Sequence, residues 1–86
     1  GLTGLPKLKR LYLGWTEVTD RGVAELTALR NLDTLWLDYT NVTDAGLKGI
    51  AKLKKLADLS LYGTTVTDEG LKELTSLTNL LYLSLG

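Results

Sequence analysis

Several residue types that carry chemistry are missing from this chain of 86 residues. It contains no cysteine and no histidine. Their absence excludes thiol nucleophiles, disulfide bonds, zinc sites built on these ligands and catalytic triads with a histidine base. We therefore expect no bound metal, no cofactor and no enzymatic activity.

Net charge and long apolar runs are lacking too. Ten basic residues balance ten acidic residues, so the formal net charge is zero. This balance argues against nucleic acid and anionic membranes as partners, because both attract basic surfaces. No apolar run reaches the roughly 18 residues that cross a bilayer, and no signal-peptide pattern is present. Methionine is absent as well, which we interpret as the mark of a processed or excised chain.

What the chain does contain is a repeat of 24 residues, with the pattern L-x-x-L-x-L-x-x-T-x-V-T-D-x-G-L-x-x-L-x-x-L-x-x. Each copy begins at a leucine: Leu8, Leu32, Leu56 and Leu80. Three complete copies and two partial ones form a single predicted domain, with bounds 1–7, 8–31, 32–55, 56–79 and 80–86. A fixed period of roughly 20 to 29 leucine-rich residues is typical of a solenoid.

Each copy predicts a short strand followed by a helical segment. Leu11 and Leu13 alternate with polar or aromatic residues, and this period of two predicts a strand whose leucines face inward. Val23, Leu26 and Leu29 recur every three residues, which predicts one face of a helix or tight helical turn. Stacked copies therefore predict an α/β fold: a leucine-rich repeat solenoid in the form of a short horseshoe arc. Parallel strands about 4.8 Å apart would line its concave face, and short helices its convex face.

The turn between strand and helix carries the pattern T-x-V-T-D-x-G. We expect the hydroxyl of Thr16 to bond loop backbone and Val18 to fill the core beneath it. Thr19 or Asp20 is the predicted helix cap. Gly22 stands early in the helix, where glycine costs about 1 kcal/mol against alanine. Because this glycine recurs in every complete copy, we predict a close approach to the neighbouring repeat.

The segment Leu8–Gly22 resembles the bacterial leucine-rich repeats with a T-D-x-G-L consensus. The similarity extends over nearly all of the chain, and Thr16 stands where the commoner type carries Asn or Cys. The resemblance implies a protein or peptide ligand on the concave face and implies no catalysis. Repeats of this family are bracketed by caps, which we do not find in this sequence. We therefore interpret the chain as a truncated or engineered fragment of a longer solenoid.

All six aromatic residues fall on or just after the outward strand positions. Tyr12 and Trp36 share one place in adjacent copies, and Trp15 and Tyr39 share another. Matching side chains on adjacent strands lie about 5 Å apart, so both pairs are predicted to stack. Exposed Tyr and Trp together are typical of binding hot spots. The predicted binding residues are Arg10, Tyr12, Trp15, Thr34, Trp36, Asp38, Tyr39, Asp58, Ser60, Tyr62 and Tyr82. Two alternatives stay open: high β propensity of aromatic residues alone, and stacking of the rings on sugars.

Two arrangements of acidic residues have simple explanations. Asp38 and Asp58 would lie about 13 to 14 Å apart on the concave face, farther than the carboxylate pair of a glycosidase. A column of aspartates, Asp20, Asp44 and Asp68, could bind calcium, but capping of the helix starts explains it better.

The ends of a solenoid without caps expose apolar surface and strand edges. The residues predicted to mediate self-association there are Leu2, Leu5, Leu80, Leu81, Leu83 and Leu85. This surface predicts a homo-oligomer and an alternative function, that of a structural scaffold.

Overall fold

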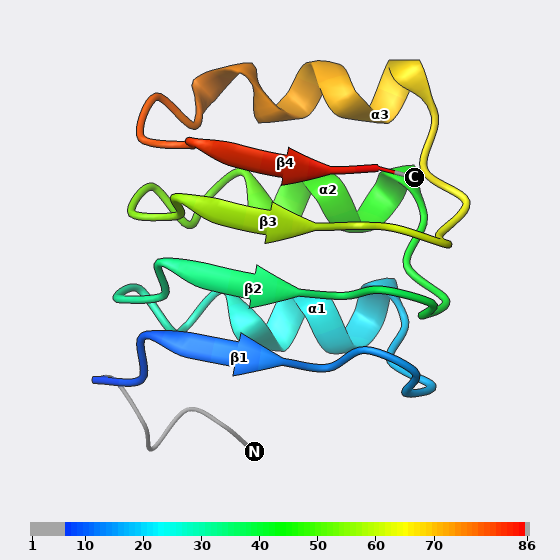
Figure 1. Ribbon diagram of the computed structural model, residues 1–86, viewed down its shortest axis with the longest axis horizontal. Coiled ribbons are helices and arrows are strands. Elements are labelled where there is room, and N and C mark those ends of the chain that lie inside the picture. Colours follow the sequence, from blue (N-terminus) through cyan, green and yellow to red (C-terminus); the bar gives the residue numbers. More distant parts are fainter. Residues whose placement is uncertain (1–6, 86) are drawn as a thin grey trace.

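Strands and helices alternate along the chain in the computed structural model, which describes residues 7–85 (Figure 1). Their bounds are β1 Arg10–Tyr12, α1 Asp20–Leu26, β2 Thr34–Trp36, α2 Asp44–Ile50, β3 Asp58–Ser60, α3 Asp68–Leu71, the 3-10 helix η1 Lys72–Ser76, and β4 Tyr82–Ser84. The order of strand and helix predicted for one copy is confirmed in each complete copy. The elements are short because a turn must return the chain to the next repeat.

The four strands form one parallel sheet in the order β1-β2-β3-β4. Leu11 pairs with Leu35, Leu35 with Leu59, and Leu59 with Leu83. Each of these steps equals the repeat length, so equivalent residues of successive copies stand side by side in columns across the sheet.

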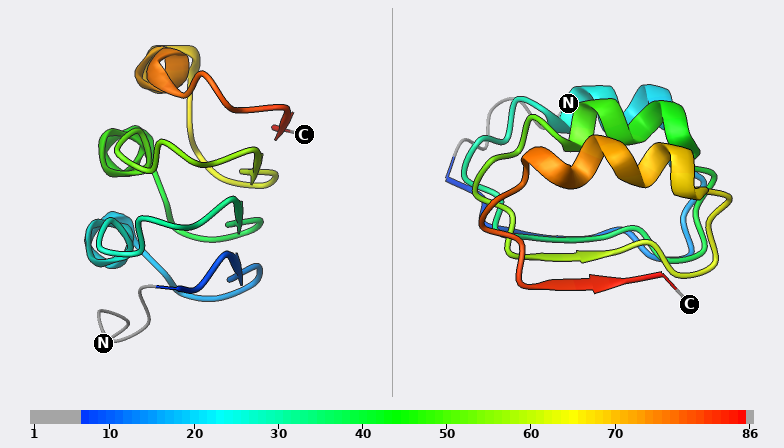
Figure 2. Two further views of the ribbon diagram at one scale, coloured as in Figure 1. Left: turned by 90° about the vertical axis from the view of Figure 1, so that its left-hand side faces the viewer. Right: turned by 90° about the horizontal axis from the view of Figure 1, so that it is seen from above.

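The helices cover one face of the sheet and leave the other open (Figure 2). In the same figure neighbouring helices lie farther apart than neighbouring strands, so the arc curves with the sheet on its concave side. The chain is a leucine-rich repeat solenoid arc, as predicted.

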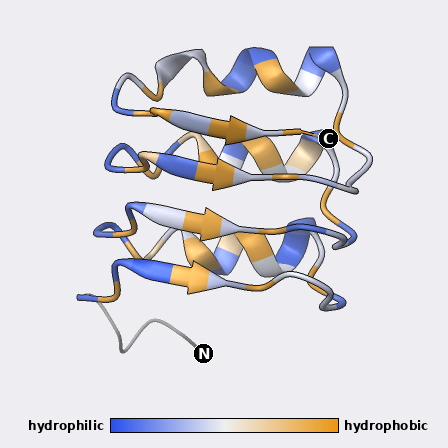
Figure 3. Ribbon diagram, viewed as in Figure 1, coloured by the Kyte–Doolittle hydropathy of each residue, from blue (hydrophilic) through white to orange (hydrophobic). Residues whose placement is uncertain are grey.

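The core lies between the sheet and the helices and is made of leucines from both layers. Leu35, Leu37, Leu59 and Leu61 are fully buried, at 0 % exposure, because a repeat covers them on each side. Figure 3 shows apolar residues at the middle of each strand, which confirms the predicted inward positions. Towards β4 the burial declines, and Leu83 is 39 % exposed.

The repeated threonine of the turn closes the end of each strand. The hydroxyls of Thr16, Thr40 and Thr64 each donate to the backbone carbonyl three residues earlier, at 2.7 Å. Val42 is fully buried in the central copy. Both predictions for this turn are confirmed there.

The helix starts differ in one respect from the predicted caps. Thr19, Thr43 and Thr67 occupy the cap position, but only the Thr43 side chain accepts a bond from its own helix, from Ala45 N at 3.4 Å. The carboxylate of Asp20 instead reaches the next repeat and accepts bonds from Thr43 N at 2.7 Å and Thr43 Oγ1 at 2.5 Å. Thr19 is thus at the predicted cap position and Asp20 is in the first turn of its helix, but the carboxylate of Asp20 is bound by the next repeat. We call this pair of contacts an Asp–Thr bridge.

The second Asp–Thr bridge joins Asp44 to Thr67 with the same distances, 2.7 and 2.5 Å. A glycine lies two residues after the start of the partner helix in each case, and its lack of a side chain leaves room for the aspartate. A Cβ on Gly46 would lie 2.5 Å from Asp20 Oδ1, and one on Gly70 would clash with the Asp44 carboxylate. The close approach between repeats predicted from the recurring glycine is confirmed at both positions.

Candidate binding surface

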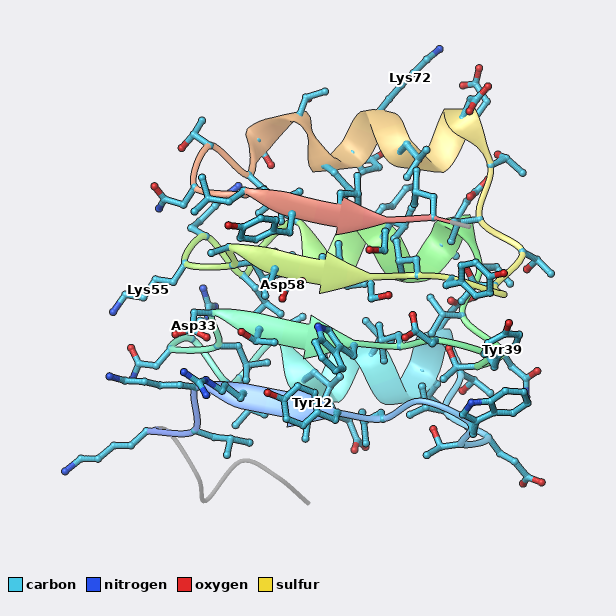
Figure 4. The ribbon with its side chains drawn as sticks, in the orientation of Figure 1. Tyr12, Asp33, Tyr39, Lys55, Asp58 and Lys72 are labelled. Atoms are coloured by element: carbon cyan, nitrogen blue, oxygen red, sulfur yellow. The ribbon has the colours of Figure 1, made fainter. Side chains whose placement is uncertain are left out.

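The open face of the sheet carries two columns of side chains. One column begins with Arg10 and Thr34, and the other with Tyr12 and Trp36. They continue on β3 and β4 as Asp58 and Tyr82, and as Ser60 and Ser84. Figure 4 shows Tyr12 and Asp58 on this face. The sheet register thus brings the strand residues of the predicted site together on one surface.

Five aromatic rings on this surface and the loops beside it form two groups in contact: Tyr12 with Trp36, and Tyr39 with Trp15 and Tyr62. The Tyr12 and Trp36 ring centroids are 4.5 Å apart and tilted by 53°. Trp15 and Tyr39 stack at 4.1 Å with 14° between their planes. Both predicted pairs are in contact, but only Trp15 and Tyr39 stack as predicted, whereas Tyr12 and Trp36 are tilted. A third contact was not predicted: Tyr62 meets Tyr39 edge to face at 5.3 Å. We call these five residues the aromatic cluster.

The backbone at Trp15 and Tyr39 has an unusual conformation, and this conformation positions their rings. Their φ angles are 61° and 55°, in the left-handed region. This conformation costs a residue with a side chain about 1 to 2 kcal/mol. Hydrogen bonds to the next repeat maintain it, from Trp15 N to Asp38 O and from Tyr39 N to Tyr62 O, both at 2.8 Å.

Gly63 occupies the equivalent position in the third copy, with φ 75°. A Cβ there would lie 2.5 Å from Cδ1 of Tyr39, so the absence of a side chain leaves room for the Tyr39 ring. Sequence reasoning missed this role. The available signal was a glycine in the column that begins with Trp15 and Tyr39.

Burial among these rings raises the pKa of Tyr39 above its ordinary value of 10.0, and Tyr62 and Asp38 add to the effect. The Tyr39 hydroxyl therefore stays neutral at physiological pH.

The carboxylate of Asp38 supports this surface through hydrogen bonds. Its Oδ1 accepts hydrogen bonds from the Ser60 hydroxyl and from Tyr62 N, the latter at 3.1 Å. Ser60 is buried, with 8 % exposure. Two predicted binding residues therefore contact each other, and their polar groups support the loop that carries Tyr62. In contrast, the Asp58 carboxylate has no side-chain partner within residues 7–85.

The residues predicted for self-association are found partly at the far edge of the sheet. Leu80 packs against the core, whereas Leu81 is 74 % exposed beside β4. Leu83 and Leu85 are exposed by 39 % and 40 %. Leu2 and Leu5 lie outside the described residues.

Metal-binding groups, membrane-spanning helices and grooves are the other features of residues 7–85 that bear on function. Residues 7–85 contain no group of three or more His, Cys, Asp or Glu side chains placed to hold a metal ion. No helix among them has the length and apolar character needed to cross a bilayer. A shallow groove between α2 and α3 is lined by Asp44, Ala45, Lys48, Glu69, Gly70 and Glu73. The Asp44 carboxylate in this groove is already engaged by Thr67.

Comparisons with known proteins agree with this architecture. A family model described as Leucine Rich repeat matches residues 4–26. The crystal structure of an internalin (inlF) from Listeria monocytogenes superposes with a TM-score of 0.88 over 99 % of this chain, at 26 % sequence identity. The chain has the leucine-rich repeat fold.

A second structure of this fold, an internalin C2 (inlC2) from the same organism, has a TM-score of 0.62 and 23 % identity over 99 % of the chain. This leucine-rich repeat chain covers 24 % and 45 % of the two internalin chains, so it spans less than half the length of either. No curated protein sequence matches it.

Proposed function

We propose that the chain is a non-catalytic module that binds a protein or peptide through its concave face. The observation that carries this proposal is the aromatic cluster. Trp15 is 78 % exposed and Tyr12 55 %, and the other three rings are exposed by 39 to 46 %. Exposed Tyr and Trp surface of this kind supplies large contact area at low entropic cost and is enriched in interface hot spots.

The backbone conformation favours a binding role over β propensity as the reason for the rings. Trp15 and Tyr39 are not in strands, and their left-handed φ angles are costly for any bulky residue. Strained positions of this type cluster at ligand-binding sites. β propensity can account for Tyr12 and Trp36, which lie within β1 and β2, but it gives no reason for the stacked pair beside them.

The fold and the net charge also support a protein ligand. Leucine-rich repeat domains generally act as protein-binding modules, and solenoids use their extended concave surfaces for binding. The zero net charge supports a protein ligand rather than nucleic acid.

The test uses a random-peptide display library selected against the intact chain. Peptides that emerge are then measured against Trp36→Ala and Tyr39→Ala. Each substitution should weaken binding by about 30-fold or more, the loss typical of a hot-spot residue, with the far-UV circular dichroism unchanged. Lys52→Ala is the matched control, because Lys52 is exposed on the helical side of the arc and should leave the affinity unchanged.

Three results would count against the proposal. The first is equal binding of the selected peptides to both aromatic variants. The second is a library that yields no peptide dependent on this face. The third is binding on a glycan array without peptide binding, which would assign the rings to sugars.

A second candidate function is self-association through the edge of the sheet. The observation that favours it is the exposed row of Leu81, Leu83 and Leu85. Light scattering over a concentration series should then show a dimer or larger species that dissociates on dilution. Leu81→Lys and Leu83→Lys should yield monomer. A wild-type chain that is monomeric at every concentration, or an oligomer unchanged by these charges, contradicts this alternative.

A further inference from the structure

The start of β3 places a negative charge on the open face of the sheet. Asp58 lies in one row with Arg10, Thr34 and Tyr82, and it is partly buried. Within residues 7–85 no hydrogen bond or ion pair engages its carboxylate. Aspartate is depleted in strands, and the other copies carry different residues at this position. The fold itself therefore gives no reason for a carboxylate here.

The charged groups nearest to this row do not neutralise Asp58. The carboxylate of Asp33 has the same sign and accepts a hydrogen bond from the Thr34 hydroxyl at 2.9 Å. Lys55 Nζ is bonded to an amide oxygen of the preceding repeat at 2.8 Å, and its side chain points away from Asp58 (Figure 4). Arg10 lies two strands from Asp58, about 10 Å away by the spacing of strands and thus at about one Debye length. The starts of β2 and β3 therefore present negative charge to a ligand.

Two exposed aromatic rings flank this carboxylate. Tyr82 is the direct partner of Asp58 on β4 and is 66 % exposed. Trp36 is 39 % exposed and lies two residues beyond the β2 partner of Asp58, so the Cα atoms of Trp36 and Asp58 are about 8 Å apart by strand geometry. A cation within about 6 Å of a ring centroid is attracted to the face of the ring. A cation bound to the carboxylate is therefore also within reach of an aromatic ring.

We propose that Asp58, Trp36 and Tyr82 bind an arginine side chain of the peptide ligand. We call these three residues the guanidinium site. Arginine fits because its planar guanidinium donates two parallel hydrogen bonds to one carboxylate and stacks on an aromatic ring. A lysine ammonium supplies the charge without this paired geometry. The inference rests on the proposed function, peptide binding by the concave face, and adds the chemistry of one ligand side chain.

The test begins with the peptides selected by display on the intact chain. The selected pool should be enriched in arginine relative to the starting library. Each arginine peptide is then synthesised with citrulline, a neutral analogue of similar shape, and with lysine in place of the arginine. Citrulline should weaken binding to the intact chain by about tenfold, because the bonds to the carboxylate lose their charge assistance. Lysine should weaken it less, because it keeps the charge.

A protein variant assigns this effect to the carboxylate. Asp58→Asn should weaken binding of the arginine peptide by about tenfold and change the affinity for the citrulline peptide by no more than about twofold. Glu25→Gln is the matched control, since it removes the same charge from an exposed position on α1, on the helical side of the arc, and should leave both affinities unchanged. Tyr39→Ala, outside the guanidinium site, should weaken both peptides because it tests the proposed function.

The outcomes separate the two proposals. Peptides that depend on Tyr39 but show no arginine enrichment overturn the guanidinium site and leave the proposed function intact. The same conclusion follows if citrulline binds as well as arginine, or if the loss with citrulline persists in full in Asp58→Asn. Peptides that bind equally to the Trp36→Ala and Tyr39→Ala variants overturn both proposals, as does a library that yields no peptide. The comparison of arginine with citrulline needs no protein variant and does not depend on the folding of Asp58→Asn.

Discussion

Replacement of Gly46 by alanine should destabilise the protein, although alanine is the better helix former. In an exposed helix interior the exchange gains about 1 kcal/mol. Here the new Cβ would lie 2.5 Å from Asp20 Oδ1 and 3.1 Å from Cγ1 of Val42. A carboxylate is normally free to move aside. This one is held by two bonds from Thr43, at 2.7 and 2.5 Å, so it can yield only if the Asp–Thr bridge breaks.

The expected magnitude follows from these distances. Relief of the contact from 2.5 Å to an ordinary 3.4 Å requires a shift of about 0.9 Å, which is enough to break both hydrogen bonds. Hydrogen bonds to a charged group contribute about 1.5 to 3 kcal/mol, and partial exposure of Asp20 favours the lower end. Set against the helix-propensity gain, the net loss for Gly46→Ala is about 1 kcal/mol.

Gly22 provides the matched control. A Cβ there would meet only Cγ2 of Val18, at 3.0 Å, which is similar to the valine contact at Gly46. Gly22→Ala therefore carries the same gain and the same crowding without the aspartate. The difference between the two variants isolates the bridge and should be about 2 kcal/mol.

Urea unfolding followed by far-UV circular dichroism measures this difference. With a slope near 1 kcal/mol per molar urea for a small domain, the two midpoints should differ by about 2 M. In an Asp20→Ala background the effect of Gly46→Ala should come to match that of Gly22→Ala. Equal midpoints in the wild-type background, or a difference that survives removal of Asp20, would refute the reasoning.

Three further predictions concern acid stability, the turn and the core. Bonds from the hydroxyl and then the N–H of the next repeat's threonine lower the pKa of Asp44 below its ordinary 3.8. The stability that this carboxylate contributes is therefore complete above pH 3.8 and is lost as the pH falls through its lower pKa in the folded state. Asp44→Asn should then flatten the acid limb of a curve of stability against pH. An unchanged acid limb would contradict the bridge. Gly63→Ala should cost about 2 kcal/mol or more and alter the near-UV circular dichroism, since it strains a φ of 75° and displaces the Tyr39 ring; a stabilised variant would exclude this packing. Leu59→Ala, at a fully buried position, should cost about 2 to 5 kcal/mol in thermal or urea unfolding, whereas Leu83→Ala should cost less than half as much, and equal losses would show that the β4 edge is covered.

The sequence by itself determined the architecture. A period of 24 residues, with leucines alternating in one segment and recurring every three residues in another, admits one way to bury both apolar faces. Each copy must stack on the next with a shift of one full period. The strand register, the buried leucines, the threonine turn and the pairing of Tyr12 with Trp36 all follow from that shift.

Only the tertiary structure determined the hydrogen-bond partner of each polar group and the orientation of the rings. The pattern T-D at a helix start favours capping when it is considered alone, but it is also compatible with a bridge to the next repeat. The two differ only in where the neighbouring helix lies, a distance that no local pattern contains. For the same reason the Tyr39–Tyr62 contact was not foreseen, because Tyr62 shares no column with Tyr39. The left-handed backbone at Trp15 and Tyr39 opposes local preference and is accompanied by hydrogen bonds that both residues donate to the next repeat.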